Sequence, residues 1–295
     1  MLFVLGSLAW MLLDQKDKTR AIFSLATLAN VFYGVALKRV MGAEGASLPW
    51  KFDRYLYHID AALGVSASAV ARALGPALPL RIVYYSLVPM MILWYAIHRR
   101  QRGSALLLAY AAEMVVGPCC YALLPACGPV YAWGAEWLRP VNVALVPIRL
   151  NAAPNAFPSL HFATALLLLV FAGGRTRRIL ALLYAGATAL ATLTTGEHYI
   201  IDLVAAVPFA CAAAYLARLH FKLAAVHLAA VLAWLFAIRF ATPAMAAHPY
   251  VLRALALVTL AIGAQALADI WHQPPAIAPE CARDLLAATE NPEVA

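Results

Sequence analysis

Long apolar runs alternate with short polar connections along almost the whole chain. Each run approaches the ~20 residues that an α-helix needs to cross a hydrocarbon layer ~30 Å thick. The apolar run at 2–13 is too short for a comfortable span and lacks the basic start and cleavage site of a signal peptide, so a ninth span, a partial span and a helix on the membrane surface all stay open. We predict eight membrane-spanning helices, near residues 21–37, 80–97, 104–124, 158–173, 179–196, 199–217, 223–240 and 250–268.

The composition agrees with helices that are surrounded by lipid. Hydrophobic residues make up 64% of the 295 residues, charged residues make up 12%, and the mean hydropathy is +0.78. Soluble domains are about half apolar and about a quarter charged, so both fractions depart from them in the direction that lipid requires. The expected fold class is an all-α, polytopic transmembrane helical bundle. No linker and no internal repeat divides the chain, which predicts a single integral membrane domain with a flexible tail at 273–295.

Basic residues gather on one side of the predicted spans, in the short connections at 16–20, 99–102, 175–178 and 218–222. Such clusters mark the cytoplasmic side of a multi-pass protein, so the remaining connections lie on the other side. The net charge of +8 comes largely from these loops, and it indicates membrane lipids, not nucleic acid, as partners. We expect a bacterial inner membrane as the location, and the oligomeric state stays open.

The segment from Gly196 to Asp202 places reactive side chains at the non-cytoplasmic end of two predicted spans. His198 is followed four residues later by the carboxylate of Asp202. Positions four apart share one face of a helix, so this carboxylate can hold one imidazole nitrogen protonated while the other nitrogen faces a substrate. The spacing predicts a nucleophilic histidine.

A second segment, from Phe157 to His161, opens another predicted span on the same side. Pro158 suits the first position of a helix, and the unpaired N–H groups of a helix start attract phosphate. His161 lies just inside this start, at the same membrane surface as His198. Together the two segments indicate an acid, a nucleophile and an anion-binding position for phosphoryl transfer.

The two segments resemble the second and third signatures of the type 2 phosphatidic acid phosphatase superfamily. Phe-Pro-Ser-Leu-His at 157–161 is closest to the inositol phosphorylceramide synthase branch, an inositolphosphotransferase of sphingolipid metabolism. His-Tyr-Ile-Ile-Asp at 198–202 is similar to the third signature. The resemblance implies a six-span core over about residues 21–217, with 223–268 as about two additional helices.

The resemblance also implies a role for each residue. His198 would be the nucleophile that forms a phosphohistidine, Asp202 its orienting partner, and His161 the acid that protonates the departing oxygen. Ser159 would bind the phosphate through its hydroxyl and backbone. The implied substrate is a phosphorylated or phosphodiester lipid at the non-cytoplasmic face, with neither a metal nor another cofactor.

Two basic positions of the superfamily pattern are not basic in this chain. The first signature has a lysine seven residues before an Arg-Pro pair, but here Ala132 precedes Arg139 by seven residues. The third signature has an arginine six residues before the histidine, where this chain has Thr192. Arginine binds phosphate best among the cations of the outer loops, so we predict that Arg149 and Arg139 bind the substrate.

Three functions stay open from the sequence. The first is transfer of a phosphorylated head group, as in inositol phosphorylceramide synthases, and the second is a lipid phosphate phosphatase acting on phosphatidate or an isoprenyl diphosphate. The third is a non-catalytic transporter or scaffold with a His/Asp network. Both histidines lie at one surface, whereas a relay across the membrane would spread its groups in depth, and this favours an enzyme. The five cysteines show no metal-ligand spacing.

Overall fold

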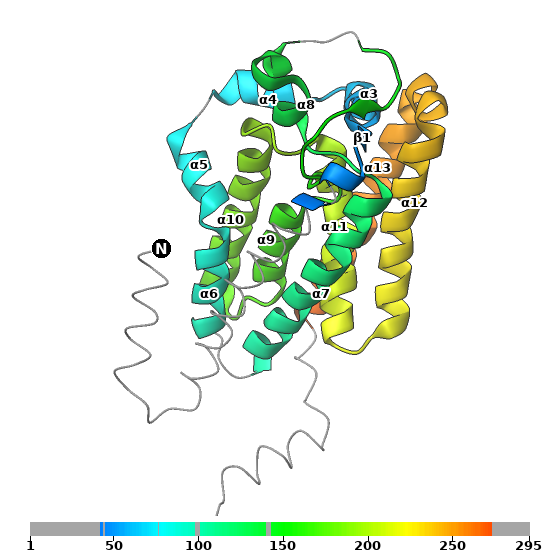
Figure 1. The fold of residues 1–295 in the computed structure, drawn as a ribbon. Helices are drawn as coiled ribbons and strands as arrows, with labels where there is room; N and C mark the ends of the chain where they lie inside the picture. Colours follow the sequence, from blue (N-terminus) through cyan, green and yellow to red (C-terminus); the bar gives the residue numbers. More distant parts are fainter. Residues whose placement is uncertain (1–41, 44, 76, 98–100, 140–142, 273–295) are drawn as a thin grey trace, which may run out of the picture.

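The computed structural model describes residues 42–43, 45–75, 77–97, 101–139 and 143–272 (Figure 1). Within them the fold is all-α except for one short two-stranded ribbon, which confirms the predicted fold class. The helices are α3 (Asp53–Leu63), α4 (Ala67–Leu74), α5 (Leu78–Tyr85), α6 (Leu87–Ile97), α7 (Gln101–Leu123), α8 (Pro129–Trp133), the 3₁₀ helix η1 (Gly134–Leu138), α9 (Leu160–Val170), α10 (Arg175–Thr194), α11 (Ile200–Ala217), α12 (Phe221–Ala247) and α13 (Pro249–His272). The ribbon pairs β1 (Trp50–Lys51) with β2 (Ile148–Arg149) in antiparallel register.

Four of the described helices are long and apolar enough to cross a membrane: Ala105–Leu123 within α7, and the whole of α11, α12 and α13. These helices support the prediction of a membrane protein. Helix α9 lies within the span predicted at 158–173, but with 11 residues it is apolar and shorter than the four long helices. The predicted span at 21–37, the run at 2–13 and the tail at 273–295 lie outside the described residues.

The span predicted at 80–97 is broken in the structure. Helices α5 and α6 meet at an angle of 53°, which is the geometry of a broken span or of a re-entrant loop. Pro89 lies in the first turn of α6, and a proline ring clashes with the carbonyl four residues before it, here that of Tyr85. The chain bends here at Ser86, whose hydroxyl donates to the carbonyl of Val83 at 2.8 Å, whereas α7, α11 and α12 continue through their internal prolines.

Helix α10 covers the span predicted at 179–196 but does not reach the same hydropathy as the four long helices. Its first turn carries three arginines, and these lower the mean hydropathy of the whole helix. Arg178 nevertheless lies with its guanidinium 4.4 Å from the ring centre of Trp271 at the end of α13. Arg178 therefore packs against α13, while Arg175 and Arg177 are exposed.

Helix α11 lies at the centre of the bundle and packs against α7, α9, α12 and α13 (Figure 1). Residues 201–215 are all buried, and many of them are alanines, which let neighbouring helices approach closely. The closest approach is at Gly263 of α13, where an added Cβ would lie 2.3 Å from Cγ1 of Val207. The central helix is thus held on several sides.

The short elements α3, α4 and α8 gather at one end of the bundle (Figure 1). Both histidine segments lie at this end, because α9 and α11 begin here and α10 ends here. The ribbon joins the chain before α3 to the chain before α9, with Trp50 opposite Arg149 and Lys51 opposite Ile148. This end therefore combines segments that are more than a hundred residues apart in sequence.

Helices α12 and α13 contact the same end through two arginines. Arg239 of α12 donates to the carbonyl of Leu123 and lies 5.0 Å from the ring centre of Phe52. Arg253 of α13 donates from Nε to the carbonyl of Ala62, in the last turn of α3, at 3.1 Å. The two additional helices therefore brace α3.

Candidate functional site

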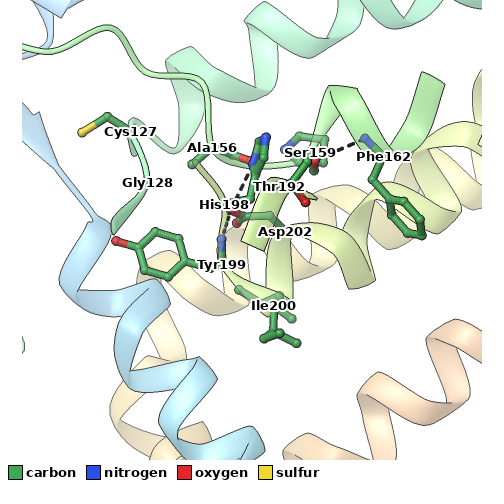
Figure 2. Close-up of polar contacts among 12 residues, drawn as sticks. Cys127, Gly128, Ala156, Ser159, Phe162, Thr192, His198, Tyr199, Ile200 and Asp202 are labelled. Carbon is green, nitrogen blue, oxygen red and sulfur yellow. Dashed lines mark hydrogen bonds and ion pairs between the residues drawn. The ribbon is translucent and has the colours of Figure 1, made fainter. Parts of the chain in front are cut away.

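The imidazole of His198 is buried and its orientation is fixed by two acceptors. Nδ1 lies 2.9 Å from the carbonyl oxygen of Ala156 and 3.4 Å from Oδ2 of Asp202 (Figure 2). A carbonyl oxygen can only accept a hydrogen bond, so Nδ1 carries the proton and donates it. In the neutral ring the lone pair is then on Nε2, which is the nitrogen available as a nucleophile.

Burial also sets the charge of this ring. Desolvation lowers the pKa of His198 to about 4, although the negative charge of Glu197 and the hydrogen bond to Ala156 act in the opposite direction. The ring is therefore neutral near pH 7, as a nucleophile requires.

Asp202 has a second partner besides the histidine. Its Oδ2 accepts the backbone N–H of Tyr199 at 2.7 Å, so the carboxylate also closes the first turn of α11. Its Oδ1 is buried and has no hydrogen-bond partner among the described residues. Sequence spacing predicted Asp202 as the group that selects the tautomer, but the carbonyl of Ala156 is the closer acceptor. Asp202 is the second, more distant acceptor beside Nδ1.

Ser159 is the N-cap of α9, because its hydroxyl accepts the backbone N–H of Phe162 at 3.3 Å (Figure 2). Its own N–H donates to the carbonyl of Asp202 at 3.2 Å, which joins the two histidine segments. Pro158 therefore lies before the cap, not at the first helical position as predicted, and the Phe157–Pro158 peptide bond is cis. The hydroxyl proton of Ser159 is the group that can still donate to a phosphate oxygen.

His161 lies in the first turn of α9, beside His198. The two ring centres are 6.1 Å apart, with an angle of 59° between the ring planes. On its other side His161 stacks on Tyr84 of α5, with ring centres 4.2 Å apart and planes 14° apart. His161 is partly exposed, whereas His198 is almost completely buried. The two histidines meet, as their positions at the same end of two helices predicted.

Two glycines bring the connection before α11 against the turn that follows α7. Gly128 has φ +92°, and an added Cβ would lie 2.2 Å from the carbonyl oxygen of Glu197. Gly196 has φ +74°, and its carbonyl accepts the N–H of Val130 at 2.9 Å. Only glycine fits a left-handed backbone this close to another chain segment. The residue next to His198 is thus in direct backbone contact with a different loop.

Two carboxylates that the sequence analysis did not select also contact this region. Asp53 and Asp60 lie on α3, and 0% and 1% of their respective surfaces are exposed. Burial raises the pKa of Asp53 to about 6, although its hydrogen bonds from Tyr199 and Cys127 lower it. Burial also raises the pKa of Asp60 well above its usual value, against the hydrogen bond that it accepts from Ile200.

The predicted phosphate-binding arginines do not contact the histidines in the described part of the chain. Arg139 pairs with Glu136 at 2.6 Å, and three quarters of its side chain is exposed. Arg149 is exposed on β2 and lines a separate hollow of about 320 Å³ with Asn151. Their role stays a prediction.

The two positions where the superfamily pattern has a lysine and an arginine are occupied here by Ala132 and Thr192. Thr192 is buried, and its hydroxyl donates to the carbonyl of Ala189 in its own helix. Ala132 lies on the short helix α8.

The arrangement thus combines a neutral histidine whose polar contacts within the described residues are all at Nδ1, a second imidazole beside it and a capped helix start. These are the parts that a phosphoryl transfer through a covalent histidine needs. Among the described residues, no group of three or more His, Cys, Asp or Glu side chains is placed to hold a metal ion.

Comparison with known proteins adds one finding. A family model described as the PAP2 superfamily, the type 2 phosphatidic acid phosphatases, matches residues 54–216, which is more than half of the chain. The matched region contains both histidine segments. Comparisons with curated proteins and with solved structures gave no match.

Proposed function

We propose a specific reaction for this chain, which belongs to the PAP2 superfamily. Membership of this superfamily supports a phosphatase- or phosphotransferase-type lipid enzyme. The proposed reaction transfers the phosphorylated head group of a phospholipid to a lipid alcohol, as inositol phosphorylceramide synthases do. It takes place at the non-cytoplasmic face and passes through a phosphohistidine at His198. The observation that carries the proposal is the 2.9 Å contact between Nδ1 of His198 and the carbonyl of Ala156, which leaves Nε2 as the nucleophile.

In the first step Nε2 of His198 attacks phosphorus. An N–P bond forms while the P–O bond to the departing alcohol breaks, and His161, which the step requires in its protonated form, gives its proton to the departing oxygen. The positive charge that develops on the His198 ring is stabilised by Asp202, whose Oδ2 lies 3.4 Å from Nδ1.

In the second step the hydroxyl of the acceptor attacks the phosphorus. An O–P bond forms, the N–P bond breaks, and His161 takes the hydroxyl proton, so that both histidines return to their starting states. Attack by water in place of the acceptor gives hydrolysis and a lipid phosphate phosphatase, which is the alternative with the same first step.

Product analysis of the purified protein tests the reaction. The protein in lipid nanodiscs is given phosphatidate, an isoprenyl diphosphate, or phosphatidylinositol with ceramide, and the products are measured as free phosphate and as lipid masses. The matched control for His198→Ala is His248→Ala, because His248 is exposed at the end of α12. A new head-group-exchanged lipid that depends on His198 supports transfer.

The other outcomes are equally definite. Free phosphate without an exchanged lipid identifies a phosphatase, and no product from any lipid leaves the transporter or scaffold as the better interpretation. Equal activity of His198→Ala and wild type would exclude the phosphohistidine.

Trapping of the intermediate tests the role of His161 separately. A nitrophenyl phosphate ester has a leaving group that needs no proton, so His161→Asn should still form phospho-His198 from it. The second step then lacks its base, and acid-labile, base-stable phosphate on the protein should accumulate above the wild-type level. No accumulation, with normal turnover, would assign the proton transfers to another group.

A further inference from the structure

We propose that two carboxylates on α3, Asp60 and Asp53, are positioning residues that hold the segment from His198 to Asp202 in its reactive geometry. The inference rests on the proposed function for its catalytic meaning. Neither residue touches the histidines. Each acts through the backbone or through Tyr199.

Asp60 supplies the cap of α11. Its Oδ2 accepts the N–H of Ile200 at 2.8 Å, and its Oδ1 accepts the N–H of Ile201 at 3.1 Å. These are the first two N–H groups of the helix, which have no acceptor within the helix itself. The N-cap residue of α11 is Tyr199, whose hydroxyl donates to Asp53. Asp202 accepts the N–H of Tyr199 locally, and a residue 140 positions earlier supplies the acceptors for the first two helical N–H groups.

Asp53 joins the same segment to the turn after α7. Its Oδ1 accepts the hydroxyl of Tyr199 at 3.0 Å and the N–H of Gly128 at 2.9 Å. Both of its oxygens lie 3.2 Å from the N–H of Cys127. In Figure 2 the side chain of Tyr199 extends toward Gly128, while the neighbouring His198 ring lies near Ala156. One carboxylate thus fixes both the turn and the residue that follows the nucleophile.

The two acids act as a pair because of their spacing on α3. Positions seven apart lie on one face of a helix, two turns from each other. Leu56 and Ile59, which lie between them in sequence, are completely buried. A buried carboxylate destabilises the folded protein unless hydrogen bonds compensate for its lost hydration. Two buried carboxylates that both accept hydrogen bonds from one segment therefore indicate that α3 positions that segment.

The position of α3 is itself fixed from the opposite side. Arg253 of α13 donates to the carbonyl of Ala62, and Arg239 of α12 lies over Phe52. The helices outside the predicted six-span core therefore brace the helix that carries the two acids. This gives α12 and α13 a role in the site without any contact to its histidines.

The test uses the full-length protein with three substitutions. Asp60→Asn keeps the shape of the side chain and one of its two acceptor oxygens. Tyr199→Phe removes only the hydroxyl that donates to Asp53. Asp269→Asn is the control, because Asp269 is exposed on α13 and contacts Gln265. Two readouts are combined: steady-state kcat and KM with the lipid substrate, and amide hydrogen exchange of the peptide that contains Ile200 and Ile201.

Asp60→Asn should lower kcat about 10- to 100-fold with little change in KM, because a displacement of about 1 Å of a catalytic group has an effect of this size. Exchange at Ile200 and Ile201 should become faster. Tyr199→Phe should show a smaller loss of the same kind, and Asp269→Asn should match wild type in both readouts.

Three results would overturn the inference: unchanged exchange in Asp60→Asn, faster exchange with unchanged kcat, or an equal loss in Asp269→Asn. If wild type has no activity on any lipid, the proposed function fails, but exchange still decides whether α3 holds the segment. Faster exchange in Asp60→Asn would then support the structural part of the inference, and unchanged exchange would reject it.

Discussion

Helix α9 begins with a cap from its own sequence, whereas α11 begins with a cap supplied by α3. Ser159 accepts the N–H of Phe162, three residues later, while Asp60 accepts two N–H groups 140 and 141 residues later. The cap of α9 is therefore local, whereas the first N–H groups of α11 depend on a tertiary contact. The cap of α9 should tolerate changes elsewhere in the molecule, and the start of α11 should loosen when its distant partner changes.

The largest expected effect comes from the close approach at Gly128. Gly128→Ala would place a Cβ 2.2 Å from the Glu197 carbonyl at a positive φ, so the turn and the segment before His198 must separate. We expect a loss of about 3 kcal/mol or more in unfolding free energy, together with loss of activity. Thermal unfolding of the purified protein measures it.

The matched control is Gly186→Ala in the middle of α10. No atom lies within 4 Å of a Cβ added there, and alanine is the better helix former by about 0.5–1 kcal/mol. This variant should be as stable as wild type or more stable. A Gly128→Ala protein with wild-type stability would show that the two segments do not need their close contact.

Acid should weaken the packing around His198. The folded protein holds the pKa of this ring at about 4, and the unfolded chain has the usual value of 6.5, so folding favours the neutral ring. The contribution is complete above pH 6.5 and is lost as the pH falls toward 4, by about 3 kcal/mol in total at about 1.4 kcal/mol per pH unit. Thermal unfolding between pH 7 and 4 measures this dependence.

The dependence is isolated by comparison with His198→Gln, which cannot titrate. The comparison is needed because Asp53, with a pKa of about 6 in the folded protein, adds stability as the pH falls and so acts in the opposite direction. Identical pH dependence in the two proteins would contradict the buried, neutral state of His198.

Asp202→Asn tests which group sets the tautomer of His198, at the start of α11. When a carboxylate alone sets the tautomer of a catalytic histidine, its amide variant loses about 10⁴-fold in kcat. Here the carbonyl of Ala156 still holds Nδ1 protonated, so we expect a loss of only about 10- to 100-fold, from the missing negative charge. A loss near 10⁴-fold in steady-state kcat would show that Asp202, and not the carbonyl of Ala156, sets the tautomer of His198.

The smallest effect should come from the local cap. Ser159→Ala removes the acceptor for Phe162 and should cost about 1 kcal/mol of unfolding free energy, the usual value for an N-cap. The exchange of Ile200 and Ile201 should stay at the wild-type rate, because their acceptor is Asp60. Faster exchange there would show that the two helix starts are not held independently.

Local patterns explain what the sequence could predict. The apolar runs predicted the positions of α7, α11, α12 and α13 because lipid solvation acts on each segment by itself. The placement of both histidines at one end of the bundle followed from the same runs. The break at Ser86 was missed although Pro89 is visible in the sequence, because composition alone made the run look continuous.

Long-range contacts explain what was missed. The roles of Asp53 and Asp60 depend on partners 74 and 140 residues away, and no short pattern records such distances. A signal was present nevertheless: two acids seven residues apart occupy the same helix face as Leu56 and Ile59. Acids on the apolar face of a short helix are expected to have buried partners.

The cap that α3 supplies to α11 also determines how this protein can be recombined with its relatives. A chimera that joins α3 of one relative to α11 of another would separate the two carboxylates from the backbone groups and the tyrosine that they were matched to. The region 54–216 begins one residue after Asp53 and ends before Arg239 and Arg253, so it is shorter than the unit that holds the site. Exchange of α3, α11 and the C-terminal pair as one block is the division that preserves the site.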